Sequence, residues 1–189
     1  MFVYTNYPAA ELFLNGKSLG IQKKNNSSAL NRYRLMWMDV IYEPGELKVV
    51  ALNADGKEIS EKSIHTAGKP YQLKLEADKT QLLANGKDLS YVTVSVVDKA
   101  GNECPTAINK LKFNVTGNGV FRAVCNGDAT SLEMFHLPTM KLFSGKLVVT
   151  VQSSKEAGDI KLQVKGSKLK SSEIVLYSRN TPFNNILNR

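Results

Sequence analysis

The chain has 189 residues, of which 42% are hydrophobic and 22% charged, a composition typical of a globular protein with one or two domains. It contains no run of about 18 apolar residues, and its first residues lack the basic and apolar segments of an export signal, so neither a membrane span nor a signal peptide is predicted. The net charge of +8 comes mainly from single lysines spread along predicted strands and turns. Nucleic-acid binders concentrate such charges beside stacking aromatics, so the sequence does not favour that class. Lysines that discourage strand edges from pairing explain the pattern better.

Short alternating segments separated by turn residues dominate the first 66 residues and predict five or six antiparallel strands. Asn15-Gly16 lies between two of these segments and is the strongest short-range signal for a type I′ β-hairpin. The polar stretch 21–33 predicts a loop. The other strands predicted in this part span residues 2–6, 34–40, 46–52 and 58–64.

Trp37 lies in the middle of the predicted strand 34–40 and allows two interpretations. A large aromatic residue at the centre of a strand is expected in the core. Together with Tyr33 and Tyr42, however, Trp37 could form an aromatic platform, because flat rings pack well on the apolar faces of pyranose sugars. These three residues are therefore the candidates for sugar contact, although the core interpretation of Trp37 is favoured.

The segment Thr66-Ala67-Gly68-Lys69-Pro70 is expected to interrupt strand pairing. Glycine adopts backbone angles that other residues cannot, whereas proline fixes φ and lacks an N–H donor. Beyond this hinge an alternating pattern resumes, with Leu73, Leu75 and Ala77 on one face of a new strand.

Seven further strands are predicted beyond the hinge, at residues 71–77, 91–97, 111–116, 120–125, 145–152, 159–165 and 173–177. Short strands at this spacing, broken by Gly, Asn and Asp, are typical of immunoglobulin-like sandwiches. We therefore predict an all-β protein with two antiparallel immunoglobulin-like β-sandwich domains in tandem. The expected domains are residues 1–67 and 68–179, followed by a flexible tail at 180–189. A domain of about 60 residues is marginally stable by itself, so the first domain is expected to depend on a neighbour.

The long connection 126–144 carries the candidate catalytic residues of the second domain, Asn126, Asp128 and Glu133. Glycoside hydrolysis requires two carboxyl groups that converge on the scissile bond, and the loop acids of this half that lie near each other in sequence are Glu103, Asp128 and Glu133. However, Asp128 follows Asn126-Gly127, which also predicts an Asx-type turn in which the side chain binds local backbone N–H groups. The sequence favours the turn over catalysis.

The cysteines and histidines form no metal-binding or catalytic pattern. Cys125 lies in an apolar run and is expected to be a small buried thiol, while Cys104 precedes a proline in a loop. A bridge between the two cysteines remains open, because the sequence does not show their Cα separation. His65 and His136 are expected to have structural roles, and no metal or cofactor is predicted.

Several stretches together resemble the C-terminal accessory domains of bacterial β-galactosidases of glycoside hydrolase family 2. In the first domain they are residues 11–20 (ELFLNGKSLG), Trp37, 42–47 (YEPGEL) and 66–70. In the second domain, residues 87–94 (KDLSYVTV) and 127–131 (GDATS) are similar to the invasin-like last domain of those enzymes. Cys104 and Cys125 depart from the expected pattern.

The resemblance implies that the catalytic barrel, with its two glutamates, lies upstream in the parent protein, so no catalytic residue is assigned here. The expected function is that of a non-catalytic scaffold or spacer for that upstream catalytic domain of the same polypeptide, in the periplasm or outside the cell. The alternative is a carbohydrate-binding or surface adhesion module, and a further one is an enzyme that uses the loop from Asn126 to Glu133.

Overall fold

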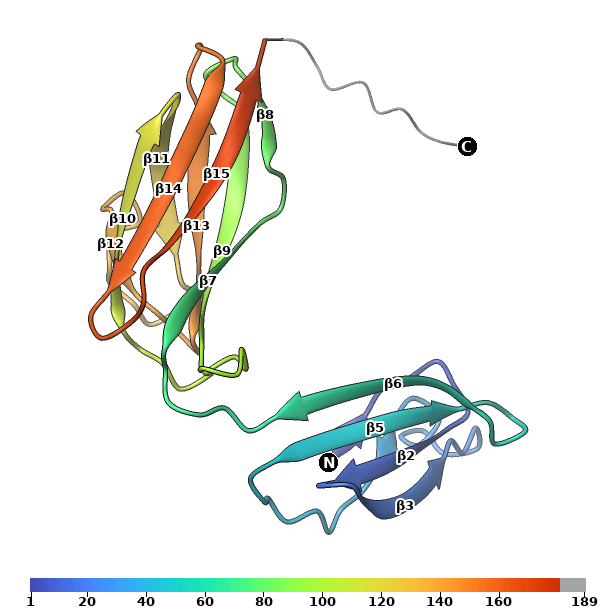
Figure 1. Ribbon diagram of the computed structural model, residues 1–189. Coiled ribbons are helices and arrows are strands. Elements are labelled where there is room, and N and C mark those ends of the chain that lie inside the picture. Colours follow the sequence, from blue (N-terminus) through green and yellow to red (C-terminus); the bar gives the residue numbers. More distant parts are fainter. Residues whose placement is uncertain (181–189) are drawn as a thin grey trace. The chain divides into compact units, whose positions relative to one another are not determined.

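The computed structural model describes residues 1–180, which form fifteen β-strands and no helix (Figure 1). The chain divides into two compact units, Met1–Thr66 and Ala67–Arg189, here called unit 1 and unit 2. The predicted all-β class is confirmed. Of the predicted tail, residues 181–189 lie outside the described residues.

Unit 1 is built on a four-stranded antiparallel sheet in the order β3-β2-β5-β6, accompanied by a small pair, β1-β4. Its strands are β1 (Phe2–Val3), β2 (Ala9–Leu14), β3 (Lys17–Lys23), β4 (Leu35–Met36), β5 (Glu46–Leu52) and β6 (Glu58–His65). The predicted strand 34–40 is reduced to β4, because the strand that pairs with it, β1, is itself only two residues long.

The hairpin between β2 and β3 confirms the prediction made from Asn15-Gly16. Leu14 pairs with Lys17, and the two residues between them have positive φ angles of 51° at Asn15 and 79° at Gly16. A type I′ turn requires positive φ at both central positions, which Asn and Gly tolerate with little strain.

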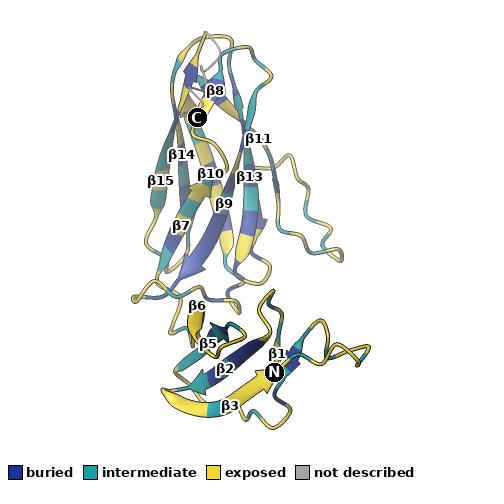
Figure 2. Cartoon of the chain, turned by 90° about the vertical axis from the view of Figure 1, so that its right-hand side faces the viewer, coloured by how far each residue is buried: buried dark blue, intermediate teal, exposed yellow. Residues whose placement is uncertain are grey.

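The main core of unit 1 lies on one face of its large sheet. Ala10 and Leu12 of β2 pack with Leu35 and Trp37, and all four are buried. The opposite face carries a smaller cluster of Ala9, Val50 and Leu52. Both outer strands, β3 and β6, are mostly exposed (Figure 2). Unit 1 therefore has a small core divided between two faces.

Unit 2 is a sandwich of a five-stranded sheet, β12-β10-β14-β15-β8, and a four-stranded sheet, β11-β13-β9-β7. Its strands are β7 (Gln72–Ala77), β8 (Gln81–Leu83), β9 (Leu89–Val97), β10 (Lys110–Gly117), β11 (Gly119–Cys125), β12 (Thr139–Lys141), β13 (Lys146–Ser153), β14 (Gly158–Gly166) and β15 (Ser172–Arg179). The pairs are antiparallel except for β8 with β15, which run parallel. The sequence did not predict β8 or β12, which are only three residues long.

One continuous core of nineteen buried residues lies between the two sheets of unit 2. Val92, Val94 and Val96 of β9 enter it from one sheet, and Ile160 and Leu162 of β14 enter it from the other. All five are fully buried, and buried positions follow β9 along most of its length (Figure 2). The period-2 alternation thus places the apolar residues of both sheets toward each other.

The two cysteines are free, and the environment of Cys125 differs from the one expected. Cys104 is buried and Cys125 is exposed, so the prediction of a buried Cys125 thiol was wrong. A β-bulge in β11 at Arg122 explains this, because it adds a residue between Phe121 and Ala123 in the pairing with β13. Phe121 and Val124 both pack on the core across this bulge, and Cys125 therefore turns outward.

Candidate functional site

The connection between β11 and β12 contains the three predicted loop candidates, and hydrogen bonds hold it in place. The Asn126 side chain donates from Nδ2 to the Lys141 carbonyl at 3.0 Å and accepts at Oδ1 from the Asp128 N–H. Asp128 Oδ1 accepts from the Thr130 hydroxyl at 2.7 Å and from the Thr130 N–H at 2.9 Å. These bonds lower the pKa of Asp128. Asp128 thus forms the predicted Asx-type turn.

Glu133 also bonds within this framework. Its Oε2 accepts from the Lys141 N–H at 3.0 Å, and its Oε1 lies 3.9 Å from the Lys110 ammonium. Its own N–H donates to the Ser131 hydroxyl. Asp128 and Glu133 therefore belong to the same loop, but each carboxylate already has partners that fix the loop.

An open hollow of about 580 Å³ lies between β11 and this loop. Its lining includes Arg122, Ser131, Glu133, Phe135 and His136. The Val124 N–H donates to the Phe135 carbonyl at 2.8 Å, so the loop is bonded to β11 where the hollow forms. Arg122 is the bulge residue of β11.

This hollow was not predicted from the sequence. His136 is expected to be structural, but the side chains of His136 and Arg122 are exposed and have no hydrogen bond or ion pair to the described part of the chain. Phe135 is 58% exposed and Leu132 is 98% exposed. The apolar residues in this connection are a signal in the sequence from which the hollow could have been predicted, because large exposed apolar groups gather at binding surfaces.

The three sugar-contact candidates of unit 1 do not share one environment. Trp37 is 5% exposed and donates from its indole N–H to the Gly20 carbonyl at 3.0 Å, as a core residue does. Tyr33 and Tyr42 are exposed, and the Tyr42 hydroxyl lies 3.2 Å from the Thr66 hydroxyl. The core interpretation of Trp37 is confirmed, and the indole offers no open face for a sugar.

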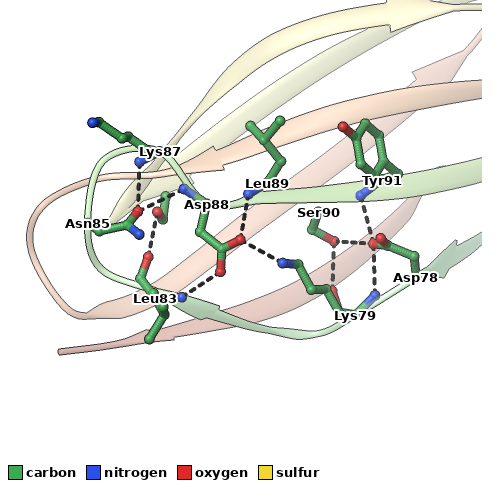
Figure 3. Close-up of polar contacts among 10 residues, drawn as sticks. Asp78, Lys79, Leu83, Asn85, Lys87, Asp88, Leu89, Ser90 and Tyr91 are labelled. Atoms are coloured by element: carbon green, nitrogen blue, oxygen red, sulfur yellow. Dashed lines mark hydrogen bonds and ion pairs between the residues drawn. The ribbon is translucent and has the colours of Figure 1, made fainter. Parts of the chain in front are cut away.

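A polar network at one end of unit 2 was not predicted either (Figure 3). Asp88 accepts from the Lys79 ammonium at 2.6 Å and from the Leu83 N–H at 2.8 Å. Burial disfavours the charged form of Asp88, but these bonds outweigh burial and lower its pKa. Asp78 accepts from the buried Ser90 hydroxyl and the Tyr91 N–H. Because every carboxylate here bonds to neighbouring backbone or side chains, the network ties the β7–β8 connection to β9.

The Asp98 carboxylate fixes the first residues of unit 2 through hydrogen bonds. Its Oδ2 accepts from the Gly68 N–H at 2.7 Å, and its Oδ1 accepts from the Ala100 and Asn102 N–H groups. The bond from Gly68, opposed by burial and assisted by Asn102, lowers the pKa of Asp98 to about 2. The nearby Cys104 thiol has a raised pKa because of burial and the charge of Asp98. Asp98 therefore anchors the predicted hinge to the β9–β10 connection.

The stability that Asp98 contributes should depend on pH. Its pKa in the folded chain lies below the unfolded value of about 3.9, so the contribution is complete above that value and is lost as the pH falls toward about 2. Asp98→Asn should lower the urea midpoint of unit 2 at neutral pH and weaken its dependence on pH between about 4 and 2. Far-UV circular dichroism measures the midpoint, with Asp159→Asn at an exposed position of β14 as control. Equal pH dependence in Asp98→Asn and the unsubstituted chain would contradict this role.

Within residues 1–180 no helix has the length and apolar character to cross a membrane. The same residues contain no group of three or more His, Cys, Asp or Glu side chains placed to hold a metal ion.

A family model described as glycoside hydrolase family 2 C-terminal domain 5 matches residues 73–175, more than half of the chain. The chain belongs to glycoside hydrolase family 2. A second model, described only as a domain of unknown function, matches residues 1–60.

Similar proteins are found along most of the chain. A β-galactosidase of Bacteroides ovatus is 41% identical over 169 residues, covering 89% of this chain and 19% of that protein. A β-glucuronidase of Formosa agariphila is 29% identical over 188 residues, covering 98% and 18%. A crystal structure of a glycosyl hydrolase family 2 member from Bacteroides cellulosilyticus matches with a TM-score of 0.85 and 34% identity, covering 94% and 22%. The chain thus spans about a fifth of the length of these relatives.

Proposed function

We propose that this chain is a non-catalytic β-sandwich segment of a β-galactosidase-like glycoside hydrolase and serves as scaffold or spacer for a catalytic barrel in the same polypeptide. The single observation that carries this proposal is its match to about a fifth of each relative, in the region described as a C-terminal domain of the family. A β-galactosidase is the parent we favour, because the relative with 41% identity is one. We also propose that the parent protein lies in the periplasm or outside the cell, as the resemblance to bacterial β-galactosidases of this family implies.

The chemistry of the described residues agrees with a non-catalytic role. A glycosidase needs one carboxyl group to donate a proton and a second to act as nucleophile or base, with both facing the scissile bond. The loop acids Asp128 and Glu133 instead interact with their own surroundings. Asp128 accepts a hydrogen bond from Thr130, and Glu133 accepts one from Lys141 and lies near the Lys110 ammonium. A lowered pKa also makes Asp128 a poor proton donor near neutral pH.

The exposed apolar side chains of unit 1 support the proposed scaffold role, because such a surface suits a domain that packs against other domains of a larger protein. Seven of its large apolar or aromatic side chains are between 58% and 79% exposed, namely Tyr4, Leu30, Tyr33, Met38, Ile41, Tyr42 and Ile64. Only seven apolar residues of this unit are buried. Exposed apolar groups of this number are common where a domain packs on another, so we propose that other parts of the parent polypeptide cover them.

The assay for this proposal is hydrolysis. The 189-residue chain should release no nitrophenol from an aryl β-galactoside above the buffer rate, because Asp128 and Glu133 bond to groups of the loop and of β12 instead of converging on an open site. Asp128→Asn and Glu133→Gln should leave that background unchanged. Turnover by the chain that either substitution abolishes would overturn the non-catalytic assignment.

A further inference from the structure

We propose that the hollow between β11 and the β11–β12 loop binds an acidic saccharide, with a sugar ring on Phe135 and a carboxylate on Arg122. This site is separate from the scaffold role and does not depend on it. It combines an exposed aromatic ring with a guanidinium and an imidazole that, within residues 1–180, have no hydrogen-bond or ion-pair partner, all in one hollow of about 580 Å³. Small-molecule sites usually have this composition, in which apolar surface is joined by a few converging polar groups.

The loop that forms the hollow is held in place before any ligand arrives. Asn126 and Glu133 bond to the backbone of Lys141, and the Phe135 carbonyl bonds to the N–H of Val124. The ring of Phe135 is therefore carried by a backbone position fixed to β11. A preformed site loses less conformational entropy on binding, which favours affinity even for a small ligand.

The β-bulge explains why a cation lines the hollow. Arg122 is the extra residue in β11, and bulges redirect side chains and occur often beside functional sites. Among the described residues its guanidinium has no hydrogen bond or ion pair. A planar guanidinium can bind a carboxylate through two parallel hydrogen bonds, a geometry that lysine cannot supply.

The charges around the hollow favour an anion. Residues 67–189 contain seventeen Lys and Arg against ten Asp and Glu, a difference of +7. The one carboxylate in the lining, Glu133, already accepts from the Lys141 N–H and lies 3.9 Å from the Lys110 ammonium, so nearby positive groups offset its charge. His136 provides a further hydrogen-bonding group in the same lining.

The ring of Phe135 selects a sugar over a simple anion. It is 58% exposed at the hollow, and an aromatic face packs well on the C–H groups of a pyranose. A uronic acid presents such a C–H face and a carboxylate within one residue. The chemistry of the hollow therefore matches a uronate-containing oligosaccharide better than a neutral sugar or inorganic anion.

Isothermal titration calorimetry of the 189-residue chain tests this site, with trigalacturonic acid as probe and neutral galactotriose as comparison. At about 50 mM salt, where charge interactions are weakly screened, we expect the acidic sugar to bind at least about 10-fold more tightly. Arg122→Gln should lower its affinity by about 10-fold or more, as expected when a charged hydrogen bond is lost. Phe135→Ala should weaken both sugars. Lys161→Gln, at an exposed position of β14, removes one cation elsewhere and should change little.

Three results would overturn the proposal. The first is that neither sugar binds at about 10 mM, which corresponds to a binding free energy near −2.7 kcal/mol or weaker. The second is an equal loss of affinity for the acidic sugar in Arg122→Gln and Lys161→Gln. The third is complete competition by equimolar sulfate, which would indicate a site for any anion. Arg122 and Phe135 are exposed, so their variants should unfold at the same urea midpoint as the unsubstituted chain. That measurement ensures that lost binding reflects the site.

Discussion

Trp37→Ala should destabilise unit 1 by about 3–5 kcal/mol, the range found when a buried aromatic residue is truncated to alanine. Trp37 is 5% exposed and packs with Ala10, Leu12 and Leu35, so its removal leaves a cavity in the main cluster of this unit. A unit of this size has a total stability of only about 3–10 kcal/mol. We therefore expect unit 1 to unfold largely, while unit 2 remains folded. Amide NMR spectra would show this as collapsed signals from residues 1–66 beside dispersed signals from unit 2.

Two further variants separate packing from other roles of Trp37. Trp37→Phe keeps most of the ring but leaves the Gly20 carbonyl without its donor, so a smaller loss of about 1–3 kcal/mol is expected. Tyr4→Ala replaces an exposed aromatic residue and should change stability by less than about 0.5 kcal/mol. If calorimetry detected galactoside binding that a still-folded Trp37→Ala variant lacked, the indole would be a sugar contact and the core assignment would fail.

The second large effect concerns the two units expressed separately. Residues 67–189 should fold cooperatively, because one core of nineteen buried residues lies between the two sheets. Residues 1–66 should be unstable or aggregate, because their seven buried residues are split between two clusters and several apolar side chains are exposed. A chain of about 60 residues buries only about 60% of its unfolded surface, which leaves little net stability.

The single tryptophan makes this comparison sharp. Fluorescence of Trp37 reports only on unit 1, whereas far-UV circular dichroism of the 189-residue chain comes mainly from the longer unit 2. Urea unfolding of the whole chain should thus show a fluorescence transition below the dichroism transition, and residues 67–189 alone should reproduce the latter. If residues 1–66 alone unfolded as cooperatively and at as high a midpoint as residues 67–189, our account of their small core would be wrong.

Local patterns in the sequence were sufficient where the chemistry that selects a conformation lies within a few residues. Asn15-Gly16 specified a type I′ hairpin because both residues tolerate positive φ. Alternation in Val92, Val94 and Val96 specified which face of β9 is buried. The Asx-type turn at Asp128 likewise needs only its own side chain and the N–H two residues later.

Patterns failed where the outcome depends on a partner far away in the chain. The three-residue strands β8 and β12 form because β15 and β10 supply their hydrogen bonds, and nothing within three residues indicates this. The hollow depends on contacts at intermediate separation, because it requires Phe135 to bond to Val124, 11 residues before it, and Glu133 to bond to Lys141, eight residues after it.

The sequence by itself determined the all-β class, the main turns and the faces of the long strands, because these follow from backbone preferences and period-2 burial. Only the tertiary structure decided where the pairing between two strands departs from a regular register, and which side chains the loops bring together. The bulge at Arg122 shows the difference most clearly, since one added residue opposite β13 turns Cys125 outward and leaves a guanidinium at the hollow. Such a bulge arises from the register between two paired strands, and register is a property of the pair that neither strand's sequence contains alone.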